Sequence, residues 1–296
     1  MTLPPDRGHI TTEQPHAETQ GLDLLSTTAC VELLAGDHMK AIEAVQLASS
    51  SIASFIDDVH QRVADGGRLI YIGSGTSGRL GVLDAAECPP TFQSDPGLII
   101  GLIAGGDEAL RKSSESAEDD PEGARQAFED IHLNAQDTVV GIAAGGTTPW
   151  VIGGLQLAKK KGVLTCLLTC SDESTEFDHT IVLETGPEPL TGSTRLKAGT
   201  ATKLTLNIIT TTLFTKLGKV YGNMMVDLRA TNNKLRDRAI RIVSTVCELD
   251  RDDAATLLNQ AESNVKLAII MHSCQTDCAT ARRRLDEAGG TLRTAL

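Results

Sequence analysis

Short apolar runs rich in β-branched residues recur through the middle of the chain, separated by helix-compatible or glycine-rich stretches. Runs of this kind are typical of buried strands, and their alternation with helices predicts a parallel sheet with crossover helices on both faces. We therefore expect an α/β fold, a three-layer αβα domain around five parallel strands. The predicted strands are residues 68–72, 98–103, 138–143, 164–169 and 181–184.

Helical apolar spacing lies on both sides of these strands. It covers residues 22–34 and 39–64 before the sheet and residues 200–217 after it, and residues 250–296 are expected to form a small bundle of three short helices. The apolar positions of residues 200–217 are too many for one face, which predicts burial on several sides or a subunit contact. The pattern divides the chain into an N-terminal helical arm, 1–58, an α/β domain, 59–222, and a C-terminal helical region, 223–296.

A glycine-rich loop, residues 73–79, directly follows the first predicted strand and leads into a helix. The exposed N–H groups and the dipole of a helix start favour a phosphate in this loop, which contains Gly75, Thr76 and Ser77. The loop lacks the Lys-Ser/Thr pair of a P-loop and the spacing of a dinucleotide-binding motif. Small-residue loops also follow the second and third strands, and ligands of such sheets bind beyond the strands' carboxyl ends. These features predict a site for a small phosphorylated metabolite.

The composition and charge of the chain limit the kinds of molecule that it is expected to bind. The chain has 296 residues, a formal charge of -12 and 41% hydrophobic content, enough for one sizeable core and a smaller region. The acidic balance disfavours nucleic acid and anionic membranes, and no apolar run is long enough to span a bilayer. Seven scattered cysteines and the lack of a signal-like N-terminus predict reduced thiols and a cytoplasmic location. The cysteines and histidines do not have the spacing of metal ligands, so no metal is expected.

Two acidic positions follow loops at this same edge of the sheet. Glu87 comes late in the helix that the phosphate loop starts, and Pro89 and Pro90 are expected to end that helix directly after it. Glu118 belongs to a second cluster that includes Glu115, three residues earlier, in a predicted helix. Two carboxylates beside a bound sugar can divide the roles of acid and base. The alternative is that both clusters are solvated surface acids.

A third stretch, residues 191–200, places hydroxyls and two cations at a helix start. Ser193, Thr194 and Lys197 are therefore predicted to form a second anion site, supplying positive charge that the chain lacks overall. The alternative is an ordinary capped helix.

Taken in order, these stretches resemble the N-acetylmuramic acid 6-phosphate etherases of the sugar isomerase (SIS) domain superfamily, from about Thr12 to the C-terminus. The resemblance implies a SIS domain, Thr76 and Ser77 on the sugar phosphate, and Glu87 and Glu118 as the two glutamates that the family uses. The matching segments are residues 12–14, 67–79, 83–92, 101–106, 117–119, 190–200, 218–221 and 225–227.

The implied reaction cleaves the lactyl ether of N-acetylmuramic acid 6-phosphate to N-acetylglucosamine 6-phosphate and D-lactate, during recycling of cell-wall sugars, without a cofactor. By the family's pattern, Glu118 takes the C2 proton, while Glu87 protonates the departing oxygen and later helps to deliver water. The two must differ in protonation, so Glu87 is expected in the drier setting. The resemblance also implies a homodimer whose subunits complete each other's sites.

One loop departs from the family pattern, which resembles Ala-Ser-Gly-Arg-Thr-Pro-Tyr. Here the serine is Gly145 and the arginine is Thr147. In related domains the serine bonds the phosphate, so the backbone of Gly145 and the hydroxyl of Thr148 are expected to compensate. Two alternatives to the etherase share the superfamily: a sugar-phosphate sensor resembling the glucokinase regulatory proteins, and an aldose-ketose isomerase. Lactate release separates the etherase from both.

Overall fold

The structure is a computed structural model that describes residues 6–112, 115–171, 177–228 and 233–296. The chain forms two compact units, Met1–Ala86 with Gly97–Ile209, and Glu87–Pro96 with Thr210–Leu296. The first unit contains the sheet, and the second is mostly helical. None of the helices described is both long and apolar enough to cross a membrane.

The sheet has five parallel strands in the order β2-β1-β3-β4-β5, which confirms the predicted α/β class. Strand β1 pairs with β2 on one side and with the central strand β3 on the other, so that Gly73 lies opposite both Ile103 and Ile142. The carboxyl ends of three strands therefore meet at one edge. The strands are β1 (Leu69–Gly73), β2 (Ile99–Ile103), β3 (Thr138–Ile142), β4 (Leu164–Thr169) and β5 (His179–Val182).

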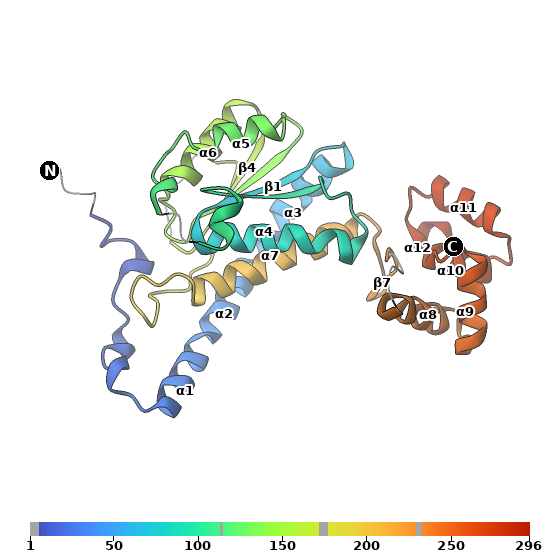
Figure 1. The fold of residues 1–296 in the computed structure, drawn as a ribbon, viewed down its shortest axis with the longest axis horizontal. Helices are drawn as coiled ribbons and strands as arrows, with labels where there is room; N and C mark the ends of the chain where they lie inside the picture. The colour runs from blue at the N-terminus through green and yellow to red at the C-terminus, as the bar shows by residue number, and fades with distance from the viewer. Residues whose placement is uncertain (1–5, 113–114, 172–176, 229–232) are drawn as a thin grey trace. The chain divides into compact units, whose positions relative to one another are not determined.

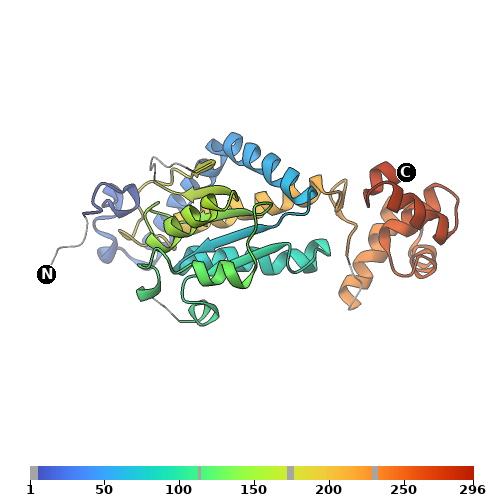
Figure 2. The same ribbon diagram turned by 90° about the horizontal axis from the view of Figure 1, so that it is seen from above.

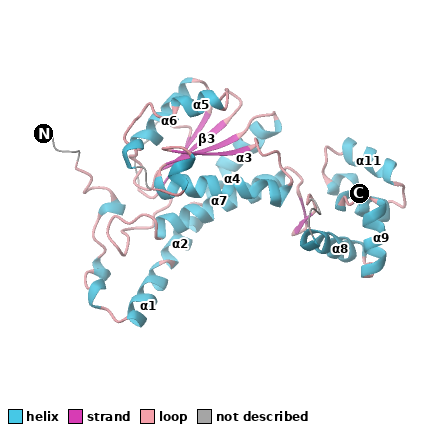
Figure 3. Cartoon of the chain, viewed as in Figure 1, coloured by secondary structure: helices cyan, strands magenta, loops and turns pink. Residues whose placement is uncertain are grey.

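Helices cover both faces of the sheet, as Figures 1 and 3 show. One layer contains α5 (Arg125–Asp130) and α6 (Pro149–Lys160), and the other contains α3 (Ser49–Ala64), α4 (Gly75–Phe92) and α7 (Lys197–Lys216). Figure 2 gives the same layers from above, with the long α7 in yellow. Side chains of β1 alternate between the layers: Ile70 and Ile72 join the core beneath α6, and Tyr71 contacts Gly81 of α4.

The N-terminal arm is more divided than its periodicity predicts. Residues 22–34 do not form one helix, because Ser26 accepts a hydrogen bond from the Ala29 N–H (3.3 Å) and so starts a new one. Residues 39–64 are divided at Ala48, whose ψ of 2° departs from helical geometry. The elements are η1 (Thr11–Glu13), η2 (Ala17–Thr19), η3 (Leu22–Leu24), α1 (Thr27–Asp37), α2 (Met39–Leu47) and α3.

Helix α4 continues through Pro89 and Pro90 to Phe92, so the prediction that these prolines end it directly after Glu87 is wrong. Each proline removes one N–H from the helical ladder, so the carbonyls of Ala85 and Ala86 lose their usual partners there. Packing supplies a reason to continue, because the Phe92 ring stacks on Phe214 with centroids 4.4 Å apart.

The second unit is a helical bundle with its own apolar core and a small hairpin. Residues 250–296 contain four helices rather than the three predicted, because Gly289 and Gly290, both with positive φ, turn the chain into a separate last helix. Lys266 is buried in this unit and bonds Asp227 at 2.6 Å. The elements are β6 (Val220–Tyr221), β7 (Met224–Met225), α8 (Asn233–Cys247), α9 (Arg251–Gln260), α10 (Val265–Ser273), α11 (Cys278–Glu287) and α12 (Leu292–Ala295).

Candidate functional site

A cavity of about 230 Å³ lies at the carboxyl ends of the central strands. Its walls come from the loop after β1, the segment after β2, the loop after β3, Thr194, and an N-terminal segment that crosses the same edge. The lining residues are Arg7, Ile10, Glu13, Ser74, Gly75, Thr76, Ser77, Glu118, Ile142, Ala144, Gly145, Thr147, Thr148 and Thr194. Seven of the predicted site residues thus share one cavity: Gly75, Thr76, Ser77, Glu118, Gly145, Thr148 and Thr194.

The loop after β1 is tight because two of its glycines approach each other closely. A Cβ atom on Gly73 would lie 2.6 Å from the Gly78 nitrogen, and one on Gly78 would lie 2.6 Å from the Gly73 carbonyl oxygen. Gly75, at φ +51°, starts α4 in a conformation that favours glycine. The result is a helix start whose first residues, Gly75, Thr76 and Ser77, all line the cavity. Such a start offers N–H groups and hydroxyls to an anion.

Glu118 faces this loop. Its half-buried carboxylate accepts a 2.7 Å hydrogen bond from the Ser74 hydroxyl. The residue lies in a turn after a short 3₁₀ helix, η5 (Glu115–Ala117), so the predicted helix is wrong here; the side chain of Glu115 is outside the described part of the chain. The carbonyl of Glu118 accepts a 2.9 Å bond from the N–H of Trp150, which fixes the turn against the start of α6.

This turn also depends on a glycine in α6. A Cβ atom on Gly153 would lie 1.9 Å from the Pro121 carbonyl oxygen, a backbone atom three residues after Glu118. We expect Gly153→Ala to lower the free energy of unfolding by about 1–3 kcal/mol, because the helix and the Glu118 segment must separate. Urea unfolding measures this loss. The matched control is Gly36→Ala in α1, where nothing lies within 4 Å, and this change should leave stability equal or higher.

The N-terminal segment forms the wall opposite the third strand's loop. Ile10 and Thr12 are buried, and the Thr11 N–H donates to the Ser171 hydroxyl at 3.2 Å. Ile10 lies where a side chain at Gly145 would point, with its methyl carbon 3.4 Å from an ideal Cβ. Ile10 and Thr12 of this segment therefore lie directly beside Gly145 in the cavity wall.

Sequence reasoning missed three residues of this segment, Arg7, Ile10 and Glu13, as well as Ser74 and Thr147. Glu13 and Ser74 lie in segments that resemble the etherase family, so this resemblance could have identified them as site residues. Arg7 and Ile10 belong to no periodic pattern, because a segment without regular structure leaves none.

Lys197 is not at the cavity, and its predicted role as an anion ligand is wrong. Its ammonium is fully buried and pairs with Asp37, 2.9 Å from Oδ2. The first N–H groups of α7 are also occupied, because the buried Glu188 carboxylate accepts bonds from the N–H groups of Lys197 and Ala198 at 3.0 and 2.9 Å. Ser193 is absent from the lining as well, and only Thr194 of this stretch reaches the cavity. The start of α7 is thus a capped helix, which was the alternative.

The carboxylate of Asp37 holds together several elements of the arm. Besides Lys197 it pairs with Lys40 at 3.0 Å and with His16 Nε2 at 3.2 Å. Burial alone would raise the pKa of Asp37, but the hydrogen bonds and charges of Lys197 and Lys40 outweigh it and hold this pKa below its usual value. His16 follows the cavity-lining segment directly, so this cluster fixes that segment to α7.

Glu87 does not line the cavity, and its side chain is exposed, whereas Glu118 is half-buried. The expected drier setting for Glu87 is therefore wrong for the single chain. Both Gly75 and Glu87 belong to α4, and the helical rise sets them about 18 Å apart along its axis. One chain alone does not bring the two glutamates together at this cavity.

No three His, Cys, Asp or Glu side chains within the described ranges gather so that they could hold a metal ion. All seven cysteines are free thiols, and burial raises the pKa of Cys170 to about 12. The groups at the cavity are thus hydroxyls, backbone amides, two carboxylates and one guanidinium, a set suited to binding anions and to acid–base chemistry.

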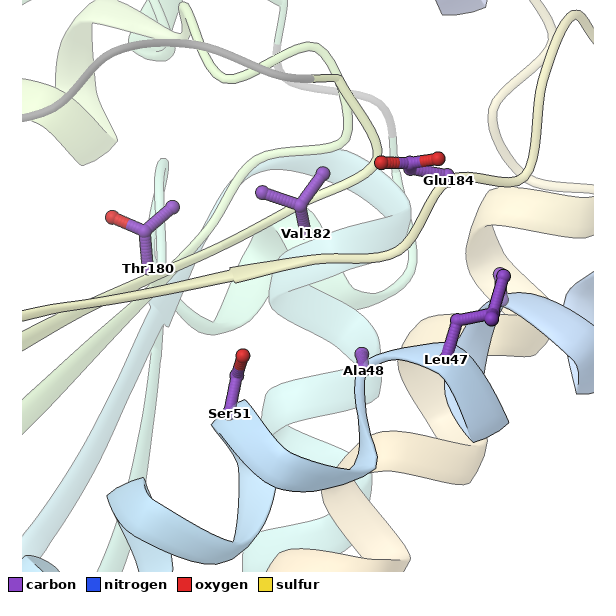
Figure 4. A pocket seen from close by; sticks show the side chains of 7 residues that line it. Leu47, Ala48, Ser51, Thr180, Val182 and Glu184 are labelled. Atoms are coloured by element: carbon purple, nitrogen blue, oxygen red, sulfur yellow. The ribbon is translucent and has the colours of Figure 1, made fainter.

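A second hollow, of about 330 Å³, lies between the helices α2 and α3 and the edge strand β5. Figure 4 shows Ser51 and Ala48 on the helices, below the strand, and Thr180 and Val182 on the strand, with their side chains directed away from the helices. Among the residues that the structure describes, Glu184 is its one charged lining residue, and no predicted site residue lines it. Its described lining thus contains no cation for an anionic ligand.

Comparison with known families finds matches to two separate segments of the chain. Residues 51–159 match the family described as glucokinase regulatory protein N-terminal SIS domain. Residues 222–266 match the C-terminal lid domain of glucokinase regulatory protein.

Relatives match over nearly the full length. A protein of Parasynechococcus marenigrum named N-acetylmuramic acid 6-phosphate etherase is 50% identical over 98% of this chain and 93% of its own. A protein of the same name from Trichormus variabilis is 51% identical over 98% of this chain and 96% of its own. Among solved structures, a putative phosphosugar isomerase from Bacteroides fragilis covers 65% of this chain and 94% of its own, with TM-score 0.50 and 17% identity. That likeness concerns the fold alone.

Proposed function

Because the chain belongs to the N-acetylmuramic acid 6-phosphate etherase family, we propose that it cleaves the lactyl ether of this sugar phosphate. In the open-chain sugar, removal of the proton on C2, next to the aldehyde, allows the C3–O bond to break and D-lactate to leave. Water then adds to the double bond, its hydroxyl at C3 and a proton at C2, and gives N-acetylglucosamine 6-phosphate. The enzyme would be a carbon–oxygen lyase of the cytoplasm.

The phosphate binds at the start of α4. Thr76 and Ser77 offer hydroxyls and N–H groups there, and Thr148 offers a hydroxyl from the loop after β3. The helix dipole adds favourable potential at the same place. Gly145 contributes its backbone to this wall, since it carries no side chain to bond the ligand.

The single observation that carries the proposal is the placement of Glu118 beside the phosphate loop. Its carboxylate accepts a bond from Ser74, directly before the residues that would hold the phosphate. No lysine or arginine within the described residues forms an ion pair with Glu118, so the carboxylate keeps a free oxygen for the C2 proton. Glu118 would act as the base, a role that contributes about 10²–10⁴ in rate.

The acid, Glu87, would come from a second copy of the chain. Leu83, one turn earlier on the same face of α4, is 50% exposed, and Ile208 of α7 is 40% exposed. Next to these two side chains, the Asn207 amide of α7 donates a 2.7 Å hydrogen bond to the Asp84 carboxylate of α4, which holds the two helices together. Large apolar side chains on a braced two-helix surface favour a symmetric dimer. Burial in that interface would also exclude water from Glu87, which would then meet the departing oxygen in a drier setting.

Incubation of the purified protein with N-acetylmuramic acid 6-phosphate tests the proposal. We expect release of D-lactate, measured with D-lactate dehydrogenase, and one deuterium at C2 of the product when the reaction runs in D₂O. The sugar without its phosphate should react far more slowly, because the helix start then has no anion to bind. Exchange at C2 without lactate would instead indicate an isomerase, and tight binding without either would indicate a sensor.

A further inference from the structure

The charges that line the cavity are unbalanced for an anionic substrate. Glu13 and Glu118 carry negative charge, and Arg7 is the single cation among the lining residues that the structure describes. The whole chain carries -12, so no general field offsets these carboxylates. An anion entering the cavity therefore needs Arg7 or a helix start to stabilise it.

Two other cations that follow or precede the cavity-lining residues in the chain, Arg79 and Lys197, are already occupied. The guanidinium of Arg79 donates to the carbonyl oxygens of Ala109 at 2.7 Å and Leu110 at 3.1 Å, bracing the loop after β2. Lys197 is buried against Asp37. Arg7, in contrast, has no ion-pair partner in the described part of the chain, and its guanidinium is exposed.

Anchored neighbours hold Arg7 at the cavity. Its carbonyl accepts a 3.0 Å bond from the N–H of Ile10, which closes a turn, and Ile10 is only 2% exposed. Two residues further, Thr12 is fully buried, and the Thr11 N–H bonds Ser171. A free guanidinium on an anchored turn is prepared for a ligand, because less chain entropy is lost when it binds.

We propose that Arg7 binds the carboxylate of the substrate's lactyl group, an inference that rests on the proposed function. The substrate carries two anions of different shape. The hydroxyls and N–H groups at the start of α4 suit a tetrahedral phosphate, whereas a guanidinium presents a planar fork that matches a carboxylate with two parallel bonds. N-acetylglucosamine 6-phosphate lacks the carboxylate, so Arg7 favours binding of the substrate over binding of this product.

Replacement of Arg7 tests this assignment by comparing two ligands. For Arg7→Gln we expect KM for N-acetylmuramic acid 6-phosphate to rise about tenfold, because a charge-assisted bond is lost. The inhibition constant of N-acetylglucosamine 6-phosphate should stay within about twofold, because its phosphate site is intact. The KM of Arg7→Lys for N-acetylmuramic acid 6-phosphate should lie between those of the wild type and Arg7→Gln, because lysine keeps the positive charge and lacks the planar fork of the guanidinium. The matched control is Arg125→Gln, an exposed arginine of α5 outside the cavity, which should change neither constant.

Equal losses for both ligands would overturn the proposal, because Arg7 would then serve the phosphate or the fold. An unchanged KM in Arg7→Gln would overturn it as well. If the wild-type protein releases no lactate, the proposed function fails, and calorimetric titration of the same two sugar phosphates still tests Arg7. The wild type should then bind the muramic sugar more tightly, and Arg7→Gln should abolish that difference; equal binding of both sugars by the wild type would overturn the inference.

Discussion

A mixture of two inactive variants, Glu87→Ala and Glu118→Ala, should recover about a quarter of the wild-type rate of lactate release once subunits exchange. Each variant alone lacks one of the two acid–base groups in every site, and each loss should lower the rate by about 10²–10⁴. Exchange makes half of the dimers mixed. In a mixed dimer, one site receives Glu118 from one subunit and Glu87 from the other, and the second site receives neither.

This experiment separates a shared site from one built within a single chain. If both glutamates of a site came from the same chain, no mixture could contain an intact pair, and activity would stay at the level of the separate variants. Subunit exchange is verified by mixing proteins with different affinity tags and recovering both on one resin. A control mixture of Glu118→Ala with Arg125→Gln should be active before and after exchange, because one of its components carries both glutamates.

Asp37→Asn should lower the free energy of unfolding by about 3–5 kcal/mol, because it leaves the Lys197 ammonium buried without its counter-charge. Urea unfolding at neutral pH measures this. The double variant Asp37→Leu with Lys197→Met should recover much of the loss, since it removes both buried charges together. Lys40→Met is the control: its side chain is 47% exposed, so its removal should change stability by about 1 kcal/mol or less. A double variant as unstable as Asp37→Asn would contradict this account.

The same carboxylate predicts a dependence of stability on pH. The folded pKa of Asp37 lies below its ordinary value, so the unfolded chain binds the proton more readily. Its stabilisation is therefore complete above the unfolded pKa, about 3.9, and is lost as the pH falls through the folded pKa. The free energy of unfolding of Asp37→Asn should lack this pH-dependent contribution. Unfolding curves of both proteins from neutral pH to pH 3 should show the difference in stability between them narrowing as the pH falls below the unfolded pKa.

The sequence predicted the sheet well because its inner strands β1 and β3 are fully buried and leave a strong local pattern of apolar and β-branched residues. The half-buried edge strand β5 starts two residues before the predicted 181–184. The glycine loop could be predicted as well, because the reason for its glycines is local: side chains at Gly73 and Gly78 would clash with nearby backbone atoms, and Gly75 has a positive φ. Lys197 and Glu87 were harder, because their surroundings are set by distant residues. Asp37 lies far from Lys197 in the sequence, so the residues around Lys197 give no sign of this partner. The exposure of Glu87 follows from how the whole of helix α4 packs.

The chain has one tryptophan, and it lies beneath the turn that carries Glu118. Trp150 is 3% exposed, and its indole ring approaches the backbone of Gly123 at the other end of that turn. Tryptophan fluorescence of the unmodified protein therefore arises from one place, next to the proposed base. We expect its intensity and emission maximum to change when a sugar phosphate binds, a label-free signal that stopped-flow mixing can follow in real time.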